Sequence, residues 1–256
     1  MKKIVFNSGL PRSGSTLLAA LLNQNPRFHA NMSVPIRQIL DNVIESINRP
    51  GNNNTELSPE KIDKVLRGIL ENYHSDEGKE VFFDHNRYWS GRHNLLKRLY
   101  PDHKMILTVR DIGWILDSYE NLGKNSIYKK PLYTTAVANS DVYSRCNDFL
   151  NVIYPIIENI KDLLHANNSN VLIIEYDLLA SNPELVMRSI YEHIEEPYFN
   201  HDFNNVTDVD GYKVFDEYIN MPGIHKIRKK VSLETRDTVI PRDIWNRTNG
   251  MEVWKN

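Results

Sequence analysis

Short apolar runs alternate with amphipathic segments along most of this chain. Four of the runs predict buried strands, at residues 4–9, 81–83, 105–109 and 171–174. Between them, apolar residues recur every three or four positions, a period typical of helices. The predicted helices cover residues 17–22, 36–47, 59–74, 90–99, about 114–122, 134–165 and 183–194, with a kink or break at Pro155 in the longest. Strands that alternate with helices predict an α/β fold, in which a central parallel sheet of four to five strands carries helices on both faces.

Two stretches depart from this alternation. Residues 49–54 read Arg-Pro-Gly-Asn-Asn-Asn, which predicts a loop that is either a mobile lid or a plain surface connection, and which opens a loop and helical insertion over 49–78. The tail 200–256 is rich in loops and contains the basic run 225–230. We expect one domain over 1–256 that includes both stretches.

The turn after the first strand has the composition of an anion-binding loop. Residues 9–16 read Gly-Leu-Pro-Arg-Ser-Gly-Ser-Thr and lead directly into a helix. Glycines at 9 and 14 allow close backbone approach, and the first N–H groups of a helix have no partner within it. Hydroxyls at Ser13, Ser15 and Thr16 and the guanidinium of Arg12 add further donors. The alternative is a plain connector made of small residues.

Composition limits the classes of partner. A formal net charge of -2 argues against general binding to nucleic acid or to a membrane surface. The single cysteine, Cys146, excludes an internal disulfide and fits a helix interior in a reducing compartment. No apolar run is long enough to span a bilayer and no targeting segment precedes the first strand, so we expect a cytoplasmic protein.

The spacing from Gly9 to Gly14 matches the P-loop of nucleotide triphosphatases, but Ser15 stands where that motif requires lysine. The sequence of residues 11–18, Pro-Arg-Ser-Gly-Ser-Thr-Leu-Leu, instead resembles the 5′-phosphosulfate loop of the sulfotransferase family. That resemblance implies a P-loop-like three-layer fold and 3′-phosphoadenosine 5′-phosphosulfate (PAPS) as donor, with 3′-phosphoadenosine 5′-phosphate (PAP) as product.

A second motif strengthens the resemblance. Arg110 ends the strand 105–109 and Ser118 follows eight residues later on the next helix. The two side chains can bracket a phosphate, and the pair is similar to the 3′-phosphate motif of sulfotransferases. The alternative for Arg110 is an ion pair with a neighbouring carboxylate. The family pattern further implies that Tyr176 lies near adenine, and that Arg228 and Lys229 in the basic tail, with Lys230, cover the nucleotide near its 3′-phosphate.

The resemblance also implies the catalytic roles. Arg12 occupies the place of the family's catalytic cation, and His85, just past the second strand, occupies that of the general base of the cytosolic members. Tyrosylprotein-type members use a glutamate instead; its place here holds Ser33, which leaves Glu45 as a distant second choice. Because ligands bind at the carboxyl ends of parallel strands, we expect the loop, His85 and Arg110 to converge on one crevice.

The predicted reaction is in-line transfer of a sulfuryl group from PAPS to a hydroxyl or amine, without a metal ion. The acceptor is a small molecule, a carbohydrate or a peptide, and three aromatic residues are candidates either for its pocket or for the core: Tyr88, Trp89 and Trp114. The rival interpretations are a P-loop nucleotide kinase or NTPase, and an inert protein that only binds nucleotide.

Overall fold

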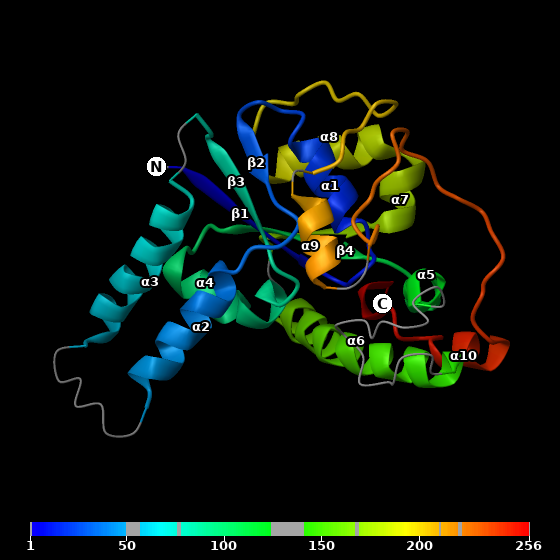
Figure 1. Ribbon diagram of the computed structural model, residues 1–256. Coiled ribbons are helices and arrows are strands. Elements are labelled where there is room, and N and C mark those ends of the chain that lie inside the picture. Colours follow the sequence, from blue (N-terminus) through cyan, green and yellow to red (C-terminus); the bar gives the residue numbers. More distant parts are fainter. Residues whose placement is uncertain are drawn as a thin grey trace.

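Five parallel strands form the centre of the molecule in the order β2-β3-β1-β4-β5. The computed structural model describes residues 2–49, 57–75, 78–123, 141–166, 169–209, 211–219 and 222–255 (Figure 1). The strands are β1 (Lys3–Gly9), β2 (Phe28–Ala30), β3 (Val81–His85), β4 (Lys104–Val109) and β5 (Val171–Glu175). The predicted α/β fold with a parallel sheet is therefore confirmed.

Helices connect the strands and lie on both faces of the sheet (Figure 1). They are α1 (Ser15–Leu22), α2 (Ile36–Ile47), α3 (Pro59–Tyr73), α4 (His93–Leu99), α5 (Ile112–Gly123), α6 (Val142–His165), α7 (Tyr176–Ser181), α8 (Pro183–His193), α9 (Tyr212–Tyr218) and α10 (Arg242–Arg247). Two short 3₁₀ helices, η1 (Trp89–Arg92) and η2 (Val253–Lys255), complete the set.

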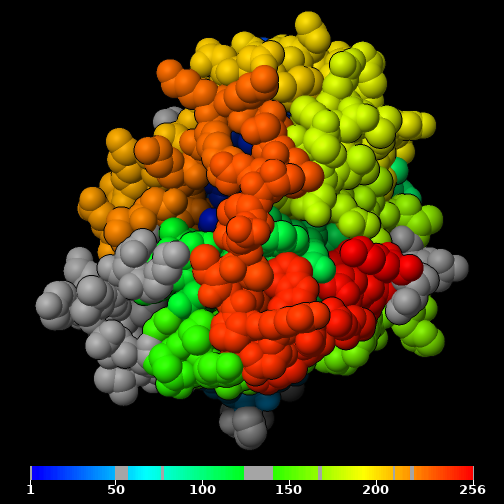
Figure 2. All heavy atoms as spheres, turned by 90° about the vertical axis from the view of Figure 1, so that its right-hand side faces the viewer, coloured from blue at the N-terminus to red at the C-terminus, as the bar shows by residue number. Residues whose placement is uncertain are grey.

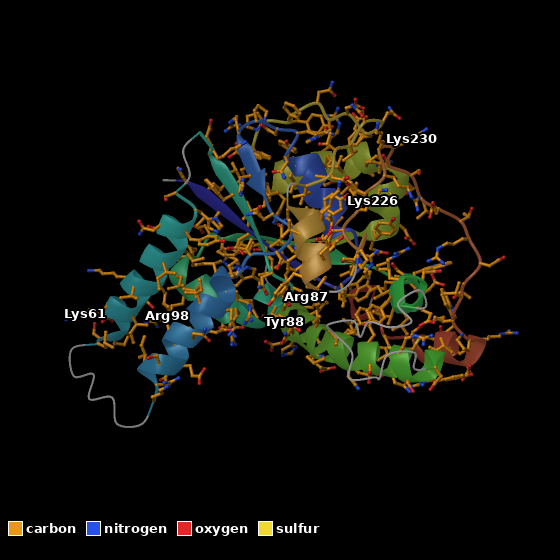
Figure 3. All side chains as sticks on the ribbon, in the orientation of Figure 1. Lys61, Arg87, Tyr88, Arg98, Lys226 and Lys230 are labelled. Atoms are coloured by element: carbon orange, nitrogen blue, oxygen red, sulfur yellow. The ribbon has the colours of Figure 1, made fainter. Side chains whose placement is uncertain are left out.

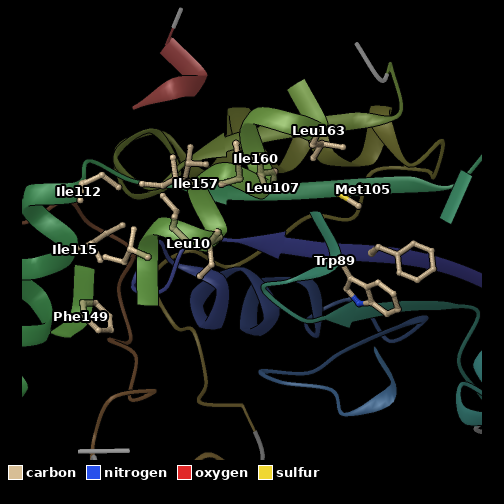
Figure 4. Close-up of a cluster of buried hydrophobic side chains, with 14 of the residues drawn as sticks. Leu10, Trp89, Met105, Leu107, Ile112, Ile115, Phe149, Ile157, Ile160 and Leu163 are labelled. Atoms are coloured by element: carbon tan, nitrogen blue, oxygen red, sulfur yellow. The ribbon is translucent and has the colours of Figure 1, made fainter. Parts of the chain in front are cut away.

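Side chains alternate between two hydrophobic cores, one on each face of the sheet. In β1, Val5 packs with α1, α7 and α8, whereas Phe6 packs into the core that holds the buried sides of α2 to α6. Figure 4 shows part of this second core, where Ile157 and Ile160 of α6 lie close to Leu107 of β4. Because both faces are covered, each central strand contains an uninterrupted apolar run, at residues 4–6 in β1, 81–83 in β3 and 105–107 in β4.

The carboxyl ends of four strands meet at one edge of the sheet. In the parallel register, Asn7 of β1 lies beside His85 at the end of β3, and Gly9 lies beside Thr108 of β4. Val109 in turn lies beside Glu175, the last residue of β5. The first loop, His85 and the two residues that follow β4 and β5 therefore share this edge.

The structure differs from the predicted elements in a few places. β2 was not predicted, because three residues are too short to show an alternating pattern. The predicted helix 90–99 is a 3₁₀ turn followed by α4. A break at Pro155 is wrong: α6 runs through it, since Pro155 is exposed and eight buried side chains hold the helix on both sides of it. The loop predicted at 50–54 and the helix start at 134–140 lie outside the described residues.

Two further observations concern individual segments. Within the described ranges, no helix has the length and apolar character needed to cross a lipid bilayer. Cys146 is a free cysteine buried in α6, as predicted, and burial raises the pKa of its thiol to about 12.

Candidate active site

A cavity of about 430 Å³ opens at the carboxyl edge of the sheet. Its walls come from the first loop, the ends of β3 and β4, helix α5, the start of α7 and the chain after α9. Basic side chains dominate its charged lining, with Glu234 as the acidic exception. The basic residues are Arg12, Arg87, Arg110, Lys226, Arg228, Lys230 and Arg236. A chain of net charge -2 has thus gathered seven cations around one hollow, which makes the hollow an anion site.

The loop between β1 and α1 is fixed by its neighbours. Leu10 N–H donates to Thr108 of β4 (2.9 Å), and the buried Ser13 hydroxyl donates to Leu10 O (2.5 Å). Gly9 has φ of +136°, and a Cβ there would lie 2.1 Å from the Thr108 carbonyl oxygen. Gly14 has φ of +89°, and its missing side chain leaves room for the ring of Tyr176. No side chain caps α1, so its first N–H groups face the cavity edge without an intrahelical partner.

Arg12 lies at the centre of the cavity wall, in the left-handed region with φ of 59°. Its Nε donates to the Ser118 hydroxyl (3.0 Å), and its Nη1 donates to the Ile224 carbonyl (2.5 Å). Burial, and then the charge of Arg110, lower the pKa of Arg12 to about 10. The guanidinium is therefore still charged at neutral pH, and no carboxylate in the described part of the chain forms a hydrogen bond with it.

Arg110 stands where β4 ends and shares the cavity with Tyr176, the first residue of α7. Its guanidinium lies 4.2 Å from the centre of the Tyr176 ring, and its Nη1 is 3.4 Å from the Arg12 carbonyl. Its buried Nε has no hydrogen-bond partner within the described part of the chain. Burial lowers the pKa of Arg110, and the nearby charges of Tyr176, Asp177 and Asp117 offset this only in part. Such an orphaned nitrogen fits an anionic group in the cavity.

His85 lines the same cavity at the end of β3. Burial, with smaller effects from Arg87 and His225, lowers the pKa of His85 to about 3. The preceding residue, Asp84, points into the core, where His74 (2.8 Å) and Trp89 (2.8 Å) bind its carboxylate. Strand alternation thus sends one of two neighbouring polar residues to the cavity and the other inward.

The chain from 222 to 239, which we call the strap, crosses the face of the molecule over the cavity. Figure 2 shows it in orange, with atoms of the blue N-terminal region visible in the hollow beside it. Between Lys226 and Arg236, the cavity is lined by the even-numbered residues of the strap and also by Ile227 and Val231. Figure 3 shows Lys226 and Lys230 along the strap and Arg87 below α9, whereas Lys61 and Arg98 lie well to one side.

Three carboxylates hold the strap. Asp208 accepts the N–H of Ile227 (3.1 Å), and buried Asp216 of α9 accepts that of Gly223 (3.0 Å). Asp117 of α5, with no exposed side-chain surface, accepts the N–H of Val239 (2.7 Å) and pairs with Arg236. The strap is therefore held by these side chains and by two backbone hydrogen bonds to the segment 203–206, from Val206 N–H to Lys229 O and from Val231 N–H to Phe203 O.

The structure brings together most of the predicted site residues. Lining the cavity are Arg12, Gly14, Ser15, Thr16, His85, Arg110, Ser118, Tyr176 and Arg228, and also Trp114 and Lys230. The Ser13 hydroxyl faces inward instead, which leaves only its backbone for a ligand.

Other predicted residues lie elsewhere. Lys229 is not part of the lining, and its carbonyl binds the N–H of Val206 (2.7 Å). Trp89 belongs to the core, and Tyr88 packs under Arg37. Ser33 and Glu45 are exposed and outside the cavity.

Four basic lining residues were not predicted as site residues: Arg87, His225, Lys226 and Arg236. Arg87 follows His85 in the same polar cluster, so the sequence could have indicated Arg87 as a site residue. The strap residues carry no comparable signal, because the lining takes the consecutive residues 224–228 and 230–232 as well as Glu234 and Arg236.

The profile of the sulfotransferase family matches residues 5–200, which contain the loop, β3, β4 and the start of α7. The chain belongs to the sulfotransferase family. Members of the family typically depend on PAPS. No curated protein matches the sequence significantly.

Solved sulfotransferases share this fold. The sulfotransferase domain of the Synechococcus PCC 7002 olefin synthase is 16% identical, with 100% of this chain and 95% of that chain covered and a TM-score of 0.55. The sulfotransferase domain of the curacin biosynthetic pathway is 15% identical over 97% and 96%, with a TM-score of 0.50. Sulfotransferase STF1 from Mycobacterium tuberculosis is 15% identical over 78% and 69%, with a TM-score of 0.52.

The described residues also bear on metal binding. Among them, no group of three or more His, Cys, Asp or Glu side chains is placed to hold a metal ion.

Proposed function

We propose that this protein transfers a sulfuryl group from PAPS to the hydroxyl or amine of an acceptor. The observation that carries the proposal is the pair of guanidiniums, Arg12 and Arg110, which lie in one cavity beside the uncapped start of α1 and without carboxylate hydrogen-bond partners. Such groups match a nucleotide that carries phosphates at both ends of its ribose.

The donor would lie across the carboxyl edge of the sheet. In this proposal, the N–H groups from Gly14 to Thr16, with the hydroxyls of Ser15 and Thr16, hold the 5′-phosphosulfate. Arg110 and Ser118 hold the 3′-phosphate, Tyr176 lies beside adenine, and the strap closes over it with Arg228 and Lys230. Lys229, which faces away, would not take part in this arrangement.

Transfer would proceed by positioning and electrostatic stabilisation. The acceptor oxygen forms a bond to sulfur while the bond from sulfur to the bridging phosphate oxygen breaks, and negative charge builds on the departing phosphate. Arg12 stays charged at neutral pH and has no carboxylate hydrogen-bond partner, so it suits the stabilisation of that charge.

The acceptor end of the cavity is partly apolar. Leu122, Phe149 and Ile219 line it together with the polar groups, which favours a small molecule that has both a hydroxyl or amine and an apolar body. A carbohydrate or peptide would need to insert its hydroxyl or amine into the cavity through the opening.

Binding of nucleotides tests the proposal against its rivals. Isothermal titration should show tight binding of PAP, weaker binding of adenosine 5′-phosphate, and no gain for ATP with Mg²⁺. Preference for ATP with Mg²⁺ would instead indicate a P-loop kinase or NTPase. PAP binding without transfer of ³⁵S from PAPS to any member of a panel of phenols, alcohols, sugars, amines and peptides would indicate an inert nucleotide-binding protein.

Replacement of Arg110 by alanine tests the 3′-phosphate assignment. A charge-assisted hydrogen bond contributes about 1.5–3 kcal/mol, so Arg110→Ala should weaken PAP by about 10- to 100-fold. Adenosine 5′-phosphosulfate, which lacks the 3′-phosphate, should lose much less affinity in the same titration. Equal losses for the two nucleotides would remove the assignment.

A further inference from the structure

A second imidazole, at His225 of the strap, lies in the cavity with a buried carboxylate behind it. Its Nδ1 is 2.5 Å from Oδ1 of Asp216, and the Asp216 side chain is 1% exposed. The other oxygen of Asp216 accepts the N–H groups of Gly223 (3.0 Å) and of His225 itself (3.2 Å). One carboxylate of α9 thus fixes both the backbone and the ring of this part of the strap.

This arrangement sets the tautomer of the ring. A carboxylate only accepts hydrogen bonds when ionised, so Nδ1 carries the proton and Nε2 is left with its lone pair. The ring lines the cavity, and Nε2 is the nitrogen that remains for a ligand.

The position of His225 relative to Arg12 places it near the reacting groups. The residue before it, Ile224, gives its carbonyl to the Arg12 guanidinium (2.5 Å). The charged and titratable groups that act on His225 are Asp216 of α9, Arg12 of the first loop and Arg87 after β3, with His85 close enough for His225 to act on it.

We propose that His225, held by Asp216, is the general base that removes the proton from the acceptor hydroxyl. This rests on the proposed sulfuryl transfer. The hydroxyl proton passes to Nε2, the acceptor oxygen forms its bond to sulfur, and the electron pair of the breaking sulfur–oxygen bond stays on the 5′-phosphate of PAP. The imidazolium formed at His225 is stabilised by the carboxylate of Asp216.

His85 has the weaker arrangement for this role. The other residues that act on its charge are the basic side chains Arg87 and His225, and burial lowers its pKa to about 3. A positive charge on His85 would be repelled by Arg87 and His225. His85 therefore remains neutral and serves to position the acceptor or the donor. His225 has a carboxylate to offset the charge that it gains.

Replacement by asparagine separates the two histidines. In His225→Asn the side-chain amide can still donate to Asp216, so the strap keeps its anchor while the proton-accepting nitrogen is lost. Transfer of ³⁵S from PAPS to the best acceptor of the panel should fall by on the order of 10²–10⁴-fold, with the Kd of PAP within about threefold of wild type. His85→Asn is the matched control and should reduce the rate less. Added imidazole should partly restore transfer in His225→Gly.

Three results would overturn the assignment. A full rate in His225→Asn with loss of rate in His85→Asn would move the base to His85. If His225→Asn loses PAP affinity and transfer rate in parallel, the pair of His225 and Asp216 has only a structural role. If PAP binds and no acceptor is sulfated, the proposed function fails by itself, and ¹⁵N spectra of the ring still test the dyad: a proton on Nε2 rather than on Nδ1 contradicts it.

Discussion

The first loop and the strap form opposite walls of one cavity, yet they are held in different ways. The loop continues directly from β1 and is tied to β4 through the Leu10 N–H and the buried hydroxyl of Ser13. The strap has no regular structure of its own, and carboxylates at 117, 208 and 216 fix its backbone. One wall is therefore part of the folding core, whereas the other depends on a few polar anchors and can separate from the body at a smaller cost in free energy.

Adding one methyl group to each wall is the strongest test of this contrast. In Gly9→Ala the new Cβ meets the backbone oxygen of Thr108 at 2.1 Å, and φ is unfavourable as well. We expect a loss of about 3 kcal/mol or more, which lowers the melting temperature by roughly 6–12 °C. Gly223→Ala in the strap has φ of +84° and no atom within 4 Å, so it should cost only about 1–2 kcal/mol. Equal melting temperatures for the two variants would contradict the comparison.

Removing an anchor should loosen the strap without affecting the sheet. Asp117→Asn takes the buried charge away from Arg236 and weakens the acceptor for the Val239 N–H. Hydrogen exchange should become faster within 236–240 and stay unchanged in β1 and β4, and PAP affinity should fall by roughly 3- to 10-fold. Asp63→Asn, which breaks a partly exposed pair with Arg98 away from the cavity, is the control and should change neither. Faster exchange throughout the sheet would show that the two walls are not independent.

Acidification should lower stability through three histidines, of which His225 belongs to the strap. Burial lowers the pKa of His85 to about 3 and that of His201 to about 4, and it also lowers the pKa of His225. Below pH 6.5 the unfolded chain binds protons that the folded protein does not, so the free energy of unfolding decreases as pH falls from 6.5 towards 4. Each such histidine contributes up to about 1.4 kcal/mol per pH unit in this window.

Melting temperatures measured between pH 7 and pH 5 check this sign. His85→Asn should flatten the decline, because it removes one of the groups that protonate only on unfolding. A melting temperature that is constant or rises over this range in the wild type would contradict the burial of these rings.

Local sequence patterns predicted the elements that depend on local chemistry. The apolar runs of β1 and β4 and the Gly-Leu-Pro-Arg-Ser-Gly loop placed Arg12 and Arg110 at the same edge of a parallel sheet, and the structure brings them into one cavity. Pro155 misled the prediction, since whether a proline breaks a helix depends on the packing of the rest of that helix. Tyr176 lay outside the predicted helices and strands but begins α7, where its ring fills the space left by Gly14.

The strap could be recognised as basic but not placed residue by residue. Lys226, Arg228 and Lys230 line the cavity while Lys229 does not, and this depends on local contacts such as the hydrogen bond from the Val206 N–H to the Lys229 carbonyl. The contact between Asp216 and His225 joins a helix to a loop in a region without hydrophobic periodicity, so nothing in the pattern pairs them. Only the folded chain shows that a carboxylate lies behind that imidazole.

Carboxylates hold the strap at both of its ends, Asp216 at Gly223 and Asp117 at Val239, and most of its cations lie between these two anchors. The number of residues between the anchors therefore sets where each cation lies over the cavity. Deleting a residue between Lys230 and Arg236 would draw the chain along a shorter path and move these cations, whereas exchanging one cation for another would leave the path unchanged.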